Sequence, residues 1–165
     1  MKTLYLMRHA KSSWSFDDLT DEQRPLNGRG RDDAPHMGQA LAKRNTKIDL
    51  LLASTAVRSL TTAALVAQEI NYPHEQIVVR PEIYHADLNE LLHVVRELPD
   101  EAQSVLLVGH NNTITELVNI FLTSPLSEEM PTAAIACLHF QIDRWAEVDR
   151  TNAELYFFDR PREAK

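Results

Sequence analysis

Two cationic side chains, Arg8 and His9, directly follow an apolar run near the start of the sequence, in the stretch LMRHAK. Two similar residues come later, Arg58 in ASTAVRS and His110 in VGHNN, and each also follows an apolar run. A neutral imidazole can act as a nucleophile, and an arginine can bind phosphate oxygens through two N–H groups. If the fold brings these four side chains together, they form a set that can bind and transfer a phosphoryl group.

The residues before these side chains are predicted to be strands buried on both faces. Such strands are short and almost continuously apolar, as in parallel sheets covered by helices. The four runs of this kind span residues 3–7, 49–53, 76–80 and 104–109. Amphipathic patterns predict helices near residues 28–44, 56–70, 88–97 and 113–123. Two further strands, at 132–140 and 153–158, are expected to form an antiparallel edge.

This alternation predicts a three-layer α/β fold with a mostly parallel central sheet flanked by helices. We expect one domain over residues 1–160 and a frayed tail at 161–165. Ligands of such folds bind just beyond the carboxyl ends of the strands. Gly109 is expected to permit a tight turn or a close approach to a ligand there.

Helix ends add further expectations. If Ser54 or Thr55 caps the second helix, Arg58 lies in its first turn, where the helix dipole disfavours a cation. A bound anion would resolve that conflict; the alternative is that Arg58 reaches a surface carboxylate. Thr113 and Glu116 have the spacing of a capping box.

The segment RPLNGRG at 24–30 precedes the first helix. Asn27 is a candidate cap for that helix, and Pro35 could kink or split it. Arg24 either reaches the same pocket or is an ordinary solvated arginine, and both possibilities stay open. Arg29 and Arg31 are interpreted as surface charges.

Composition excludes several classes of function. With 17 basic and 24 acidic side chains among 165 residues, the net charge of −7 argues against a general nucleic-acid or membrane-surface binder. The N-terminal apolar stretch is too short for a signal peptide, and no stretch reaches transmembrane length. We therefore expect a cytoplasmic protein. Cys137, the only cysteine, is predicted to lie in the core.

Taken together, these motifs resemble those of the histidine phosphatase superfamily, which includes phosphoglycerate mutases and acid phosphatases. The resemblance rests on MRHA, STAVRSLTTA and VGHN, and it covers roughly the whole chain. It is greatest to the small SixA-type phosphohistidine phosphatases, whose RPL segment is matched by RPLNGRG and whose later region resembles MPTAAIACLHF.

The resemblance implies a phosphoglycerate mutase-like fold and a phosphatase that forms a covalent phosphohistidine intermediate. Carried over by position, His9 is the nucleophile, and Arg8, Arg58 and His110 hold the phosphoryl group. Arg24 adds a further phosphate contact, as the RPL segment does in the SixA-like branch. No metal or other cofactor is implied.

Larger family members also use a carboxylic acid to protonate the leaving group. Glu82 is the candidate here, either as proton donor or as a bystander, while Asp87 and Glu90 are interpreted as acids at a helix start. A phosphohistidine substrate makes less demand for such an acid, because its leaving group is an imidazole.

The expected substrate, as the resemblance implies, is phosphohistidine in a protein. The chain has little room for an insertion that would cover the pocket, and an open site suits a phosphorylated protein side chain or a loosely bound small phosphate ester. A phosphatase of small phosphate esters with the same fold is the main alternative, and a mutase ranks below it. A non-catalytic phosphate-recognition module is a further alternative. A metal hydrolase is disfavoured, because the seven histidines show no recognised ligand spacing. The sequence predicts neither the oligomeric state nor a role for Trp14.

Overall fold

The computed structural model describes residues 1–161. Six strands form one sheet in the order β3-β2-β4-β1-β5-β6. Their bounds are β1 Lys2–Arg8, β2 Leu50–Ala53, β3 Val78–Val79, β4 Ser104–Gly109, β5 Ile135–Phe140 and β6 Ala153–Asp159. The first four in this order are mutually parallel. Strand β5 pairs antiparallel with β1, and β6 pairs antiparallel with β5, which confirms the predicted antiparallel edge.

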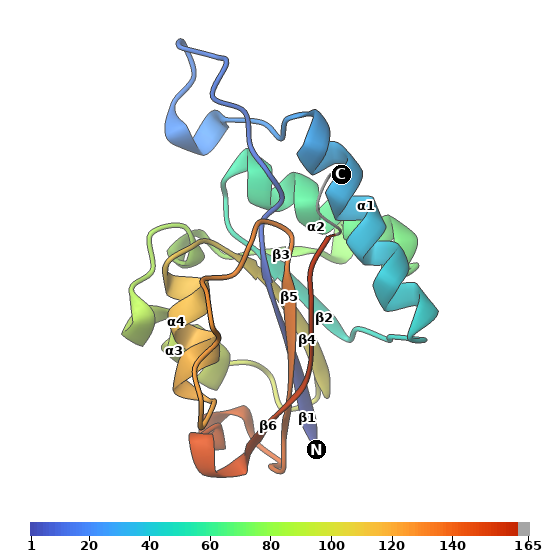
Figure 1. Cartoon of the computed structure of the whole chain (residues 1–165). Coiled ribbons are helices and arrows are strands. Elements are labelled where there is room, and N and C mark those ends of the chain that lie inside the picture. The colour runs from blue at the N-terminus through green and yellow to red at the C-terminus, as the bar shows by residue number, and fades with distance from the viewer. Residues whose placement is uncertain (162–165) are drawn as a thin grey trace.

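Four α-helices cover the two faces of the sheet (Figure 1). They are α1 Gly28–Lys43, α2 Val57–Glu69, α3 Leu88–Arg96 and α4 Thr113–Ile120. Helices α1 and α2 pack together on one face, and α3 and α4 pack together on the other. The predicted three-layer α/β architecture is confirmed. None of the helices among residues 1–161 is long and apolar enough to span a bilayer.

The central strands contribute to two separate cores, which explains their continuous apolar sequences. In β4, Leu106 and Val108 pack toward α1 and α2, while Val105 and Leu107 pack on the opposite face. Because successive side chains of a strand alternate between faces, a strand covered on both sides needs apolar residues at every position. Cys137 is fully buried in β5, as predicted.

The prediction of a buried strand at 76–80 is wrong. Only Val78 and Val79 form a strand, and their side chains are 37% and 43% exposed. The reason is their place in the sheet: β3 lies at an edge and pairs with β2 alone.

Two predicted caps are also absent. The N-cap of α4 is Asn112, because the Thr113 hydroxyl donates instead to the carbonyl of Ala86 at 2.8 Å. The N-cap of α2 is Ala56, with no side-chain hydrogen bond. The Thr55 hydroxyl donates to Glu22, and the Ser54 hydroxyl contacts His110 and accepts from the Ala56 N–H, before the helix begins.

Helix α1 begins as predicted. The Asn27 side chain accepts a hydrogen bond from the Gly30 N–H at 2.9 Å. Pro35 lies inside the helix, which continues as one element to Lys43. The tail predicted at 161–165 lies, beyond Pro161, outside the described residues.

Candidate active site

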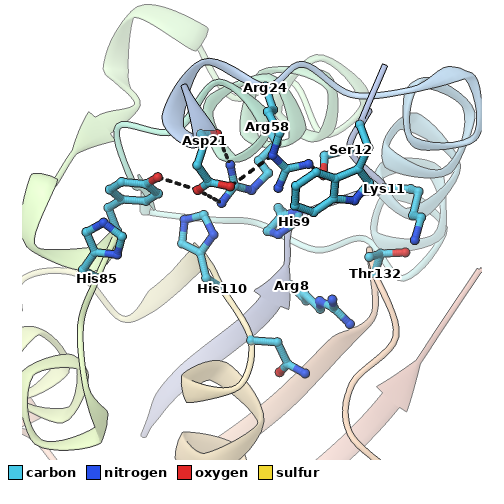
Figure 2. Close-up of a pocket in the computed structure, with 13 residues that line it drawn as sticks. Arg8, His9, Lys11, Ser12, Asp21, Arg24, Arg58, His85, His110 and Thr132 are labelled. Carbon is cyan, nitrogen blue, oxygen red and sulfur yellow. Dashed lines mark hydrogen bonds and ion pairs between the residues drawn. The ribbon is translucent and has the colours of Figure 1, made fainter. Parts of the chain in front are cut away.

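The carboxyl ends of β1 and β4 lie side by side, and this arrangement brings the two motif histidines together. Arg8 is paired with Gly109 across the parallel strands, and the His9 N–H donates to the Gly109 carbonyl at 3.1 Å. The His9 and His110 ring centroids are consequently only 5.1 Å apart. Arg58 enters from the first turn of α2, which follows the neighbouring strand β2. Arg8, His9, Arg58 and His110 line one cavity of about 310 Å³ (Figure 2); we call these four residues the pocket floor.

A backbone carbonyl fixes the tautomer of His9. Its Nδ1 lies 2.7 Å from the carbonyl oxygen of Ala10. A carbonyl oxygen can only accept, so Nδ1 of the neutral ring carries the hydrogen and Nε2 carries the lone pair. The ring is 8% exposed and lines the cavity. His9 is therefore oriented as a nucleophile whose reactive nitrogen is Nε2.

Burial and neighbouring cations keep both histidines neutral. Desolvation, together with the charges of His110, Arg58 and Arg8, lowers the pKa of His9 to about 3, although the bond to Ala10 opposes this shift. Desolvation and the Arg58 charge lower the pKa of His110 to about 4. A neutral imidazole at physiological pH is the form that nucleophilic attack requires.

The two arginines of the pocket floor hold unsatisfied hydrogen-bond donors. Among the described residues, the buried side-chain nitrogen and oxygen atoms without a partner are the Nε atoms of Arg8 and Arg58. Desolvation also lowers the pKa of the Arg8 guanidinium. Buried donors without partners are costly, and an anion between the two arginines would remove that cost.

Arg24 also lines the pocket, which decides between the two possibilities left open by the sequence. Its side chain is buried, and Nη1 donates to the Ser12 hydroxyl at 2.7 Å and to the Ser13 carbonyl at 3.1 Å. Its Nε donates to Asp21 at 3.0 Å. These bonds make Arg24 a fixed wall of the site.

Asp21 is a pocket residue that the sequence analysis did not single out. It lies in the short 3-10 helix η1, Asp21–Gln23, and its carboxylate bridges Arg24, Arg58 and Tyr84 (Figure 2). Hydrogen bonds from Tyr84, and from Arg58 and Arg24, hold the pKa of Asp21 well below its usual range. Asp21 is therefore an ionised partner of the arginines and a poor proton donor. Its spacing of three residues before Arg24 was the signal that could have revealed it.

Tyr84 and His85 also line the pocket and were missed. They follow the short 3-10 helix η3, Pro81–Ile83, directly after β3. The same rule that places ligands beyond strand ends, applied to β3, points to this segment, in which Glu82 was the residue predicted to act. We call Trp14, Asp21, Tyr84 and His85 the pocket rim.

Glu82 is not among the residues of this pocket. It contributes to a separate surface depression beside α3, and its carboxylate accepts a hydrogen bond from Arg80 at 2.7 Å. That bond lowers the pKa of Glu82, so its carboxyl group is ionised at neutral pH and carries no proton to donate. The geometry therefore does not support a role for Glu82 as proton donor, because the Glu82 carboxylate is bonded to Arg80 outside the pocket.

Glycine acts at a different position from the one expected. Gly109 has no positive φ, and an added Cβ would meet only side chains, the nearest being Ile114 at 3.2 Å. At Gly30, in contrast, a Cβ would lie 2.1 Å from the carbonyl oxygen of Lys11. Gly30 thus allows the segment after His9 to approach α1 closely.

Helix α2 anchors the same segment from the other direction. The Ala10 N–H donates to Thr62 Oγ1 at 3.0 Å, and the Thr62 hydroxyl donates to the Arg58 carbonyl at 2.7 Å. The His110 Nε2 lies 2.7 Å from the Ser54 hydroxyl. These contacts fix His9 and His110 relative to Arg58. Within residues 1–161, no group of three or more histidine, cysteine, aspartate or glutamate side chains is arranged to hold a metal ion.

Known structures share this architecture. A protein assigned as the phosphohistidine phosphatase SixA from Agrobacterium tumefaciens superposes with a TM-score of 0.83 at 29% identity, over 97% of this chain and 98% of that one. The protein histidine phosphatase SixA, solved with tungstate, superposes with a TM-score of 0.79 at 23% identity, over 96% of both chains, and shows the same fold.

A relative found by sequence also aligns over nearly the whole chain. An uncharacterized protein of Mycobacterium leprae, ML1117, is 30% identical over 94% of this chain and 100% of its own. Residues 4–91 match the model of the histidine phosphatase superfamily, branch 1. That segment contains Arg8, His9, Arg24 and Arg58. The predicted family and fold are confirmed: this chain belongs to the histidine phosphatase superfamily.

Proposed function

We propose that this protein is a phosphatase that forms a covalent phosphohistidine intermediate on His9, and that its substrate is phosphohistidine in proteins. One observation carries the first part. His9 is held with the Nε2 lone pair available, in the same cavity as two arginines whose Nε donors have no partner.

The reaction has two displacements. In the first, His9 Nε2 attacks phosphorus, a P–N bond to the enzyme forms, and the bond to the leaving group breaks. In the second, water attacks phosphorus, the P–Nε2 bond breaks, and inorganic phosphate leaves. Arg8, Arg58 and His110 stabilise the charge on the phosphoryl oxygens, which is the main requirement of phosphoryl transfer.

The choice of phosphohistidine follows from the carboxylates of the pocket. Among residues 1–161, Asp21 is the one carboxylate that lines the pocket, and its three hydrogen-bonding partners keep it ionised. An alkoxide leaving group needs a proton from such an acid. An imidazole leaving group makes less demand for one, so the site fits a phosphoramidate better than an alkyl ester.

Trapping of the phosphoenzyme tests the first part. The protein is mixed with a phosphoramidate, quenched in alkali, which preserves the P–N bond, and digested for mass spectrometry. We expect a phosphoryl group on His9 in the wild type and in His74→Ala, and none in His9→Ala; the exposed His74 is a matched control. Turnover in His9→Ala should fall by at least about 10³-fold. Phosphate binding without turnover would instead indicate the recognition module.

Competition between substrates tests the second part. A phosphohistidine peptide and an alkyl phosphate are supplied to the same enzyme, and kcat/KM is measured for each. We expect a preference for the peptide. Equal or greater efficiency on a small ester would replace the protein substrate with a metabolite and leave the His9 mechanism intact.

A further inference from the structure

Trp14 is an exposed aromatic residue at the mouth of the pocket. Its side chain lines the cavity, yet Trp14 is 74% exposed. An indole has a large apolar surface that is usually covered, at least in part, by the fold. No feature of the pocket floor explains why such a side chain lies at this position.

One face of the indole is covered by Arg24. The guanidinium carbon of Arg24 lies 3.5 Å from the centroid of the Trp14 ring. Arg24 cannot readily move away, because Asp21, Ser12 and Ser13 accept its hydrogen bonds. A cation stacked on one face fixes the plane of the indole and leaves the opposite face available.

The backbone around Trp14 is fixed as well. Ser12 forms an antiparallel bridge with Leu26, and the Ser13 N–H donates to the Pro25 carbonyl at 2.8 Å. The Ser15 N–H donates to the Ser13 hydroxyl at 3.1 Å. An aromatic side chain held in this way can bind a flat partner at a small entropic cost.

A second aromatic surface belongs to the same pocket. The rings of Tyr84 and His85 are in contact, with centroids 4.0 Å apart and planes tilted by 36°, and the Tyr84 ring centroid is 5.5 Å from that of His110. In Figure 2, His85 and Ser12 lie on either side of His9. The lining of the cavity thus combines the arginines of the pocket floor with the aromatic side chains of the rim.

We propose that Trp14 is a specificity-determining residue, whose free ring face stacks on the group that carries the phosphate and selects a flat aromatic carrier, such as imidazole, over an aliphatic one. This inference rests on the proposed function, because the pocket floor must hold the phosphoryl group. It names the part of the substrate that the rim recognises.

Binding of two non-hydrolysable ligands tests the inference without the need for turnover. Phenylphosphonate and cyclohexylphosphonate have the same charged group and similar size, but only the phenyl ring is flat and aromatic. Their dissociation constants are measured by calorimetry on the full chain for the wild type, Trp14→Ala, Trp14→Phe and Phe16→Ala. Phe16 is a matched control, since it is 50% exposed on the same loop but is not among the residues that line the pocket.

We expect Trp14→Ala to weaken phenylphosphonate about 3- to 10-fold, the range of an aromatic stacking interaction, and cyclohexylphosphonate less than about 2-fold. Trp14→Phe should restore most of the preference, and Phe16→Ala should change neither constant. Equal losses on both ligands, or no loss on either, would overturn the inference, because a structural or general apolar role would not distinguish them. Loss of turnover is a separate result that concerns the proposed function, since phosphonate binding does not depend on it.

Discussion

The pocket floor and the pocket rim are built in different ways. The floor comes from residues at strand ends and in the first turn of α2, and both His9 and Arg58 are less than 10% exposed, at 8% and 6%. The rim comes from irregular segments, and its Trp14 and His85 side chains are exposed. The proposed roles divide in the same way: groups of fixed geometry on the floor are proposed to carry the chemistry, and exposed groups on the rim to contact the variable part of the substrate.

The largest expected effect comes from changing the cation at the floor. Arg58→Lys keeps the charge but loses the Nε donor and the forked pair of hydrogen bonds to the Asp21 carbonyl and carboxylate. We expect kcat/KM to fall about 10²-fold, measured on a phosphoramidate. Arg29→Lys, at a surface ion pair with Asp33, is the control and should behave as wild type. A loss below about 3-fold would mean that Arg58 supplies charge alone.

As the pH falls, the two histidines of the pocket floor should lower the free energy of unfolding before Asp21 has any effect on it. In the folded protein the pKa of His9 is lowered from the usual 6.5 to about 3, and that of His110 to about 4. The unfolded chain therefore binds more protons below pH 6.5, and stability is lost as pH falls through the window from 6.5 toward those values. Between about pH 7 and 5 we expect His9 to account for about 2 kcal/mol of the decrease in unfolding free energy, and the partly exposed His110 for less.

Urea unfolding across this pH range provides the measurement. His9→Gln should lower the proton uptake on unfolding near pH 5.5 by about one proton, because its side chain does not titrate. An unchanged slope of stability against pH in that variant would show that His9 is protonated in the folded state. Asp21, whose pKa is lowered, should reduce the free energy of unfolding only at lower pH, where protonation of its carboxylate removes its ion pairs.

A smaller effect is expected at the rim carboxylate. Asp21 occupies donors of Arg58 and Arg24 and opposes a bound anion by its charge. Asp21→Asn should tighten binding of inorganic phosphate about 2- to 5-fold, as measured by calorimetry. Asp17→Asn makes the same charge change on the same exposed loop without a pocket contact, and should have less effect. Weaker phosphate binding in Asp21→Asn would show that Asp21 serves mainly to position the arginines.

The smallest effect is expected outside both regions. Glu82→Gln should change kcat less than about 2-fold on either a phosphoramidate or an ester, since the carboxylate is paired with Arg80 away from the pocket. A selective tenfold loss on the ester would restore Glu82 as a proton donor.

The layers and the pocket floor could be predicted from the order of residues along the chain. Continuous apolar runs required strands covered on both faces, and parallel strands place their ends at one edge, so Arg8, His9 and His110 had to be neighbours once β1 paired with β4. Arg58 was recognisable because a cation in the first turn of a helix contradicts the helix dipole.

The pocket rim and the lengths of the peripheral elements, in contrast, depend on long-range contacts that the sequence does not reveal. Asp21, Tyr84 and His85 lie in segments without a periodic pattern, and their positions depend on contacts between residues more than 60 apart, such as Tyr84 with Asp21 at a separation of 63. The hydroxyl groups of Thr113 and Thr55 found distant partners in place of local caps. Local propensity cannot predict such choices, because long-range hydrogen bonds and packing outweigh the small energies of a cap or a short edge strand.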